Sequence, residues 1–408
     1  MTARKPELLV ALALALFLAS WLLLHVGFYE RDQIVDTPVY EKYGTAIEDG
    51  QVPYRDFEVE YPPGALPVFA LPALVDTDFR RAFEWLMALC GAGTVLAVAL
   101  AARSLGLGVV PPLLVALSPL AIGSVILTRF DLWPVMLAAF ALAALVAERL
   151  RLGHGLLGAA VAVKLFPAVL LPLTVAFVWR RRGRREALVC AAVCAAVVVA
   201  VFVPFLLVAP GGVLDSFGRQ LSRPLQIESF GAGLLLAAHD AFGLELEMHS
   251  SHGSQNLVGG LPGTLAVLSS IAQLAVLVWL WARFARDPRG PSPAELVVAA
   301  AAVLTAFVAL GKVLSPQFLI WLVPFVPLAA RAGANVLLLA ALVLTQIWFP
   351  YRYWELVREF DPTVSWLVLA RDLVLLALLV TLARRRPEAF RSASPARSRR
   401  TAPAHLRS

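Results

Sequence analysis

Charged residues are scarce in this sequence: they make up 15% of its 408 residues, whereas hydrophobic residues make up 60%. A soluble domain averages about 25% charged and about 45–50% apolar residues. The mean hydropathy of +0.77 and several long apolar runs therefore predict an integral membrane protein, because about 20 apolar residues in a helix cross the hydrocarbon core. The repeated ten-residue alternation of a membrane barrel is missing, so we expect the spanning segments to be helices.

Common metal-binding and catalytic motifs are also missing. The sequence contains no P-loop, no GxSxG turn and no HExxH motif. We interpret the three cysteines, which are Cys90, Cys190 and Cys194, as small residues buried in apolar runs rather than as a disulfide or metal site. Asp76 and Asp78 form a DxD pattern directly before an apolar run, where capping of a helix N-terminus is the expected role. We therefore expect no metal ion and no cofactor.

The net charge of +7 comes from 35 basic and 28 acidic residues. The basic residues stand at the ends of apolar runs, which indicates membrane topology rather than nucleic-acid binding. The first apolar run is longer than the core of a typical signal peptide and lacks a cleavage region, so we expect an uncleaved first helix. We predict membrane helices at about 8–28, 82–102, 110–127, 132–150, 153–163, 165–179, 186–208, 261–284, 294–311, 316–330, 333–350 and 364–383.

The positive-inside rule is difficult to satisfy between Arg151 and Arg180, because this interval is too short for two full spans. A tilted or re-entrant hairpin of two short helices, with Lys164 and Pro167 near its apex, would resolve the conflict. Non-helical backbone at membrane depth is tolerated only where protein or a water-filled cavity surrounds it. This interval is therefore a first indication of a cavity.

With the basic clusters in the cytoplasm, both termini are expected to be cytoplasmic. The tail at 384–408 is rich in Arg, Ser, Ala and Pro, and we expect a disordered basic segment that contacts membrane lipids. No internal repeat typical of a transporter is evident. The segments expected on the outer face are 28–79, 128–131, 209–260, 311–317 and 350–364.

The segment at 32–63 is the first long polar stretch, and it is rich in carboxylates and tyrosines. One acid held over a site is sufficient to take a proton from a hydroxyl group. The residues leave the choice among Asp32, Asp36 and Glu60 open. The alternative interpretation is a solvated helix at 37–49 with scattered acids and no catalytic role.

Several cations are expected on the outer side, against the positive-inside bias. Arg129 and Asp131 join two apolar runs, and such a pair is often structural. Lys164 stands alone in an apolar run, where it either extends toward the interface or binds an anion. Lys312 repeats this pattern and Arg223 lies in the second long polar loop. Fixed positive charge of this kind suits a leaving phosphate group.

Five motifs in this order resemble those of glycosyltransferase family 87, over roughly residues 10–350. The first outer loop is similar to that of the family in Asp36-x-x-Val39-Tyr40, Gly50-x-x-Pro53-Tyr54 and Glu60-Tyr61-Pro62-Pro63. The remaining motifs are Arg129-Phe130-Asp131, Lys164-x-x-Pro167, Arg223-Pro224-Leu225-Gln226-x-Glu228-Ser229 and Lys312-x-x-Ser315-Pro316-Gln317-Phe318.

The resemblance implies the GT-C fold: an all-α polytopic transmembrane bundle of about 11–12 membrane helices, some of them short or re-entrant, within one domain at 1–383. It implies outer loops at 29–80, which is catalytic, and at 209–260. It further implies an inverting, metal-independent transfer of a sugar, with mannose expected, from a polyprenyl-phosphate donor. The acceptor would be a glycan, glycolipid or related molecule outside the bacterial plasma membrane.

The resemblance also selects Asp36 as the catalytic base. We expect the donor phosphate to be held by Arg129, Lys164, Arg223 and Lys312. We expect the sugar and acceptor pocket to be shaped by Glu60, Tyr61, Asp131, Gln226, Glu228, Ser315 and Gln317. The alternative functions are a transporter or flippase of polyprenyl-linked lipids and, ranked last, a membrane scaffold.

Overall fold

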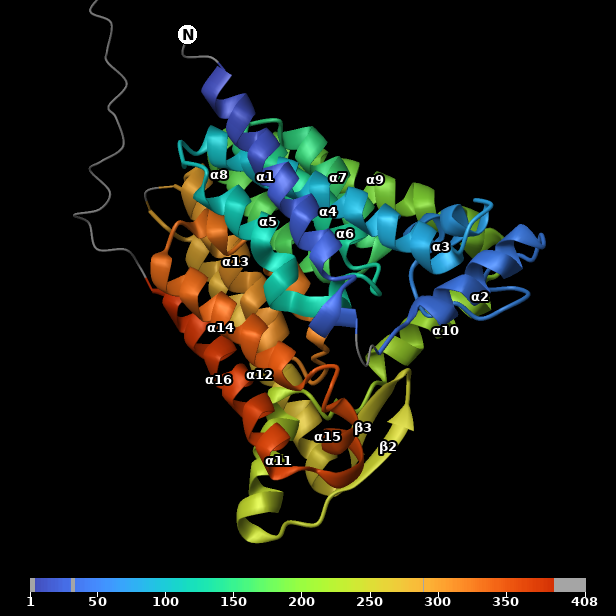
Figure 1. The fold of residues 1–408 in the computed structure, drawn as a ribbon. Helices are drawn as coiled ribbons and strands as arrows, with labels where there is room; N and C mark the ends of the chain where they lie inside the picture. The colour runs from blue at the N-terminus through green and yellow to red at the C-terminus, as the bar shows by residue number, and fades with distance from the viewer. Residues whose placement is uncertain (1–3, 31–33, 289, 385–408) are drawn as a thin grey trace, which may run out of the picture.

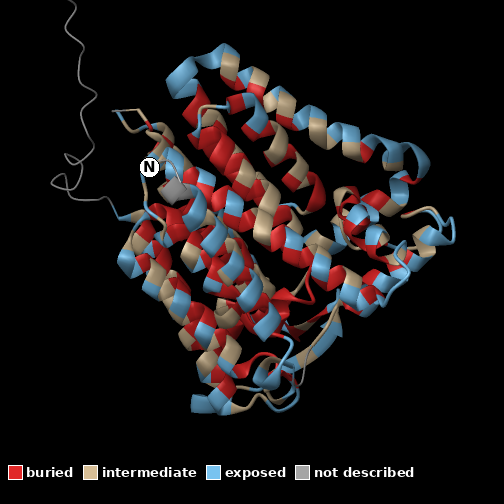
Figure 2. Cartoon of the chain, turned by 45° about the horizontal axis from the view of Figure 1, so that its top comes forward, coloured by how far each residue is buried: buried red, intermediate tan, exposed pale blue. Residues whose placement is uncertain are grey.

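The computed structural model describes residues 4–30, 34–288 and 290–384 (Figure 1). Asp32 and residues 385–408 of the predicted basic tail lie outside the described residues. Within the described part, the chain is an all-α polytopic bundle with one small sheet, as the composition predicted. Buried residues gather inside this bundle, and exposed residues follow the outward faces of its helices (Figure 2).

The first half of the chain is helical almost throughout. Its elements are α1 (Arg4–Leu23), η1 (Gly27–Glu30), α2 (Thr37–Glu48), η2 (Pro63–Ala65), α3 (Leu66–Ala73), α4 (Phe79–Ser104), α5 (Val110–Ile122), η3 (Gly123–Ile126), α6 (Leu132–Val146), α7 (Leu150–Val163), η4 (Phe166–Leu170), α8 (Leu171–Arg182) and α9 (Arg184–Val208).

The second half adds the sheet, which lies at the lower end of Figure 1 beside α11 and α15. The strands pair antiparallel in the order β1-β3-β2. The elements are α10 (Pro210–Leu221), β1 (Leu225–Gln226), α11 (Phe230–Phe242), β2 (Glu247–Ser251), β3 (Ser254–Val258), α12 (Gly260–Ala285), α13 (Pro293–Ala309), η5 (Pro316–Trp321), η6 (Pro327–Ala329), α14 (Ala332–Trp348), α15 (Tyr353–Glu359) and α16 (Pro362–Ala383).

Four helices in the described part are long and apolar enough to cross a membrane, namely α4, α9, α12 and α16. They match the predicted spans at 82–102, 186–208, 261–284 and 364–383. The pair α14 and α15, bent by 69°, makes a fifth if it is counted as one span. Other apolar helices are shorter, among them α5, α6, α7 and α13. The chain is thus a membrane protein that combines a few full-length helices with several short ones.

The interval between Arg151 and Arg180 contains two short helices, as predicted. The first, α7, ends at Lys164, whose backbone is extended with φ −155° and ψ 140°. The short η4 then leads into α8. The break thus ends α7 at a buried position and places Lys164 outside a continuous helix.

The prediction of a membrane helix at 316–330 is wrong. This segment consists of η5 and η6 separated by turns, and most of its side chains are buried. Pro316, Pro324 and Pro327 prevent a regular helix because each lacks a backbone donor and clashes with the preceding turn. Irregular backbone is tolerated here because the surrounding protein buries it.

Candidate active site

A cavity of about 460 Å³ is lined by the residue before α2, by α10, by the β2–β3 turn and by the segment at 311–321. Its lining contains most of the predicted site residues, brought together from distant parts of the chain: Asp36, Glu60, Tyr61, Lys164, Arg223, Lys312, Ser315 and Gln317. Of the other four, Arg129, Asp131 and Gln226 contact lining residues directly, and Glu228 is connected to the lining through Gln226. All twelve thus belong to one assembly.

Asp36 is the residue directly before α2, and its carboxylate faces the cavity rather than capping the helix. Its Oδ2 lies 3.1 Å from Nε of Arg129 and 3.4 Å from the hydroxyl of Tyr40. The side chain of Asp36 is 33% exposed, whereas that of Arg129 is 6% exposed. Arg129 therefore orients a carboxylate that remains accessible from the cavity.

Lys164 lies in an aromatic cage with a buried counter-ion. Its Nζ is 2.7 Å from Oδ1 of Asp131, and the indole nitrogen of Trp321 donates to the same oxygen at 2.5 Å. The ammonium also lies over the rings of Phe130 and Trp321, at 4.7 and 5.3 Å from their centroids. Asp131 is 1% exposed, so a buried carboxylate largely balances the charge of Lys164.

Arg223 and Lys312 differ from the other two cations, because neither forms an ion pair with any carboxylate of the described residues. Nζ of Lys312 donates to the carbonyl of Leu221 at 2.9 Å. Burial lowers the pKa of Arg223, and burial together with the positive charge of Arg223 lowers the pKa of Lys312. Two neighbouring positive charges thus line the cavity, and neither forms an ion pair within the described residues, although Glu60 and Glu228 lie close enough to act on Arg223.

Gln226 connects the wall of the cavity to its lining. Its side-chain amide donates to Oγ of Ser315 at 2.7 Å and to the carboxylate of Glu228 at 2.5 Å. Its backbone amide donates to the carbonyl of Lys312 at 3.0 Å. Glu228 is 2% exposed, and burial raises its pKa to about 7. This segment therefore fixes the backbone that carries Lys312.

Glu60 lies at the rim of the cavity, against the turn between β2 and β3. A Cβ atom at Gly253, which has φ +66°, would lie 3.4 Å from both carboxylate oxygens of Glu60. The amide of Gln220 donates to the carbonyl of Glu60 at 3.3 Å. The neighbouring carbonyl of Tyr61 accepts from the hydroxyl of Tyr54 at 2.6 Å. The positive φ at Gly253 is the backbone conformation that favours glycine, and the turn that it forms contacts the segment between α2 and η2.

Several polar residues of the lining were not identified from the sequence. Ser270 and Gln273 come from α12, Gln220 from α10, and His252 from the β2–β3 turn. Ser270 and Gln273 interrupt an apolar run, and this pattern could have identified them as candidate site residues. The positions of Gln220 and His252 depend on long-range packing, so no local pattern indicates them.

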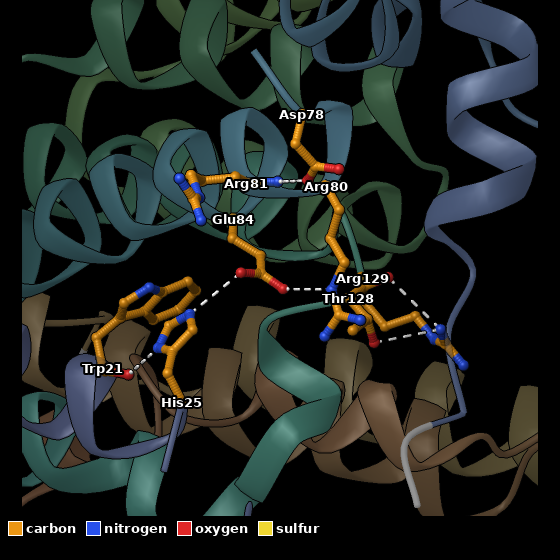
Figure 3. Close-up of polar contacts among 8 residues, drawn as sticks. All are labelled: Trp21, His25, Asp78, Arg80, Arg81, Glu84, Thr128 and Arg129. Carbon is orange, nitrogen blue, oxygen red and sulfur yellow. Dashed lines mark hydrogen bonds and ion pairs between the residues drawn. The ribbon is translucent and has the colours of Figure 1, made fainter. Parts of the chain in front are cut away.

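A second polar cluster lies outside the cavity lining and has a structural character (Figure 3). Glu84 in α4 accepts from Arg80 at 2.8 Å and pairs with His25 at 3.1 Å, which connects α4 to the end of α1. Asp78 caps α4 by accepting from the backbone amide of Arg81 at 2.9 Å. This confirms the capping interpretation of the DxD pattern. All three cysteines are free and buried, as predicted.

The sequence of the chain was compared with known proteins. The family model described as glycosyltransferase family 87 matches residues 60–316. No curated protein matches the chain. The matched range contains Arg129, Lys164, Arg223 and Lys312, whereas Asp36 precedes it.

Proposed function

The chain belongs to glycosyltransferase family 87, and on that premise we propose a donor, an acceptor and a mechanism for its transfer reaction. The donor is a sugar, with mannose as first choice, on a polyprenyl monophosphate. The acceptor is a hydroxyl group of a glycan, glycolipid or related molecule at the outer face of the bacterial plasma membrane. The observation that carries the proposal is a single cavity that joins the accessible carboxylate of Asp36 to Arg223 and Lys312, two cations that form no ion pair within the described residues.

In this mechanism Asp36 is the general base. Its carboxylate takes the proton of the acceptor hydroxyl while that oxygen forms a bond to the anomeric carbon of the donor sugar. The bond from the anomeric carbon to the phosphate oxygen breaks, and its electron pair remains on the phosphate. Direct displacement inverts the anomeric centre. Arg129 lies against the carboxylate of Asp36 and holds its orientation.

Arg223 and Lys312 hold the leaving phosphate. Their positive charges repel one another, since Arg223 lowers the pKa of Lys312, and an anion between them removes this repulsion. Fixed cations stabilise the charge that develops on a monophosphate, without the divalent ion that a diphosphate commonly needs. Lys164 adds a charge at the cavity wall, and Arg129 acts through Asp36; both are already balanced by carboxylates.

The remaining lining suits the other parts of the substrates. Aromatic side chains provide an apolar wall for the first isoprene units, among them Phe217, Phe307 and Phe318. Hydrogen-bonding groups for the sugar and the acceptor come from Glu60, Tyr61, Gln226, Glu228, Ser315 and Gln317, with Asp131 holding Lys164. We assign these functions to one domain at 1–383, and we place the cavity outside the membrane and both termini in the cytoplasm.

The test is a transfer assay with purified protein in nanodiscs. Polyprenyl-phosphate-[14C]mannose is supplied with a glycolipid extract as acceptor, and a sugar nucleotide is the comparison donor. We expect labelled acceptor and free polyprenyl phosphate from the lipid donor only, without added metal. Transfer from the sugar nucleotide alone would contradict the proposed donor. Movement of the lipid between leaflets in vesicles without sugar release would favour a flippase instead.

A further inference from the structure

A buried ion pair in the membrane-spanning helix α16 has no role in the reaction described above. Nε of Arg371 lies 2.7 Å from Oδ1 of its neighbour Asp372, and both side chains are fully buried. The guanidinium also lies over the ring of Trp348, at 5.9 Å from its centroid. Removing two charges from water costs several kcal/mol per ion, and apolar replacements of such pairs are often neutral or stabilising. Stability alone is therefore a poor reason for this pair.

The pair makes one hydrogen bond to a segment of the candidate active site. NH2 of Arg371 donates to the backbone carbonyl of Glu228 at 2.7 Å. From Glu228 the contacts continue through the side chain of Gln226, whose backbone amide binds the carbonyl of Lys312. Arg371 in α16 is thus connected through Glu228 and Gln226 to Lys312, one of the two cations that form no ion pair within the described residues.

The segment at 225–229 is short and fully buried, and it contains the two-residue strand β1 and the cap of α11. Its backbone amides at Gln226 and Ile227 and the side chain of Gln226 make further hydrogen bonds, all from neutral donors. The bond from Arg371 differs from these because its donor is charged. Arg223, the other of the two cations, lies two residues before β1. Movement of the segment would therefore change the positions of both Arg223 and Lys312. A hydrogen bond from a charged donor to a backbone carbonyl is stronger than one between neutral groups.

We propose that Arg371 is a positioning residue: its hydrogen bond to the carbonyl of Glu228 holds the segment at 225–229, and with it the cation pair Arg223 and Lys312, in place for the donor phosphate. Asp372 holds the guanidinium in the orientation that this bond requires. The part that concerns the donor phosphate rests on the proposed function, whereas the restraint on the segment does not. Arg371 lies outside the range matched by the family model.

Two measurements on Arg371→Met in nanodiscs test this role. The first is hydrogen exchange of peptides that cover 225–229, where the amides of Gln226 and Ile227 are hydrogen-bonded in the native protein. We expect faster exchange there and unchanged exchange in α13. The second is steady-state kinetics. We expect KM for the polyprenyl-phosphate sugar to rise about tenfold, as loss of one charged hydrogen bond implies, with KM for the acceptor unchanged.

A matched control is Ser365→Ala, which removes another hydrogen bond of a buried side chain in α16, that to the carbonyl of Phe360. It should leave both measurements as in the wild type. Because Arg371→Met leaves Asp372 unpaired, the double variant R371M/D372L is the second test if the single variant does not fold. Neutral replacement of both charges should restore folding and keep the faster exchange.

Unchanged exchange at 225–229 together with an unchanged donor KM, in a folded variant, would overturn the proposal. A wild type that transfers no sugar from a polyprenyl phosphate would reject the proposed donor instead. The exchange measurement would still decide whether Arg371 holds the segment. The two failures are therefore distinguishable.

Discussion

The carboxylate of Asp36 and the guanidinium of Arg129 lie 3.1 Å apart, although one residue precedes α2 and the other precedes α6. The contact joins the segment directly before α2 to the turn between η3 and α6. It leaves a third of the Asp36 side chain exposed to the cavity and buries Arg129 almost completely. The carboxylate of Asp36 is therefore accessible from the cavity while the buried guanidinium of Arg129 holds it in place. A general base requires both accessibility and a fixed position.

Asp36→Asn should abolish transfer. The amide keeps the size of the side chain and can still accept a hydrogen bond from Arg129, but it cannot take a proton. Loss of a general base typically costs about 10²- to 10⁴-fold in rate. The measurement is initial-rate transfer from polyprenyl-phosphate mannose. Glu41→Gln, an exposed carboxylate on α2, is the control and should keep wild-type activity. Near-normal turnover of Asp36→Asn would remove Asp36 as the base.

The binding of the donor should weaken at alkaline pH. The pKa of Lys312 is lowered by burial and by Arg223, so Lys312 loses its charge as pH rises through this lowered value. KM for the donor should therefore rise at alkaline pH. In Arg223→Met the pKa of Lys312 should return toward its usual value, which moves the alkaline limb to higher pH although overall affinity falls.

The measurement is KM for the donor as a function of pH in the wild type and in Arg223→Met. Arg55→Met is the control, because Arg55 is exposed and pairs with its neighbour Asp56. Its profile should overlap that of the wild type. An alkaline limb that stays in place in Arg223→Met would show that the two cations do not interact.

Lys164→Met should strongly destabilise the protein. It leaves Asp131 buried without its counter-ion, and loss of one partner of a buried pair typically costs about 3–5 kcal/mol. The measurement is the free energy of unfolding in a detergent-denaturant titration. Arg55→Met breaks an exposed pair, for which about 0–1 kcal/mol is typical. If both variants lost a similar, small part of the free energy of unfolding, Asp131 would be solvated rather than buried.

Glu228 should make stability depend on pH. Burial raises its pKa from 4.5 to about 7, against the lowering effects of Arg371, Gln226, Arg223 and Arg129. The folded protein then binds a proton more tightly than the unfolded chain. The stabilising contribution is fully present below about pH 4.5 and is lost as pH rises through about 7.

Glu228→Gln should remove this contribution, so the difference in free energy of unfolding between variant and wild type should change across that pH window. Glu58→Gln, at an exposed acid between α2 and η2, serves as a comparison. Its pKa is lowered by Arg219, so its stabilising contribution depends on pH in the opposite direction and is lost at acidic pH. A flat difference curve for Glu228→Gln would mean that Glu228 titrates normally.

The sequence alone determined the class of fold. Long apolar runs correctly predicted the four full-length apolar helices α4, α9, α12 and α16, because each residue that enters the hydrocarbon must have a suitable side chain. Most of the other predicted spans are shorter apolar helices. The same local logic correctly predicted the cap at Asp78 and the break at Lys164. It failed at 316–330, where apolar composition outweighed three prolines, and it did not predict α10, α11 or the sheet of the 209–260 loop.

Tertiary structure decided which charges are balanced. Twelve polar residues were recognised along the chain, but their pairing was not, because ion pairs form between residues that are distant in sequence and depend on packing of several helices. Only the fold assigns Asp131 to Lys164 and Asp36 to Arg129, and leaves Arg223 and Lys312 without an ion pair in the part of the chain that the structure describes. Only the fold also connects Arg371 to Glu228. Residue types in the sequence identified the polar groups, whereas long-range packing determined which of them are paired and therefore the electrostatic potential in the cavity.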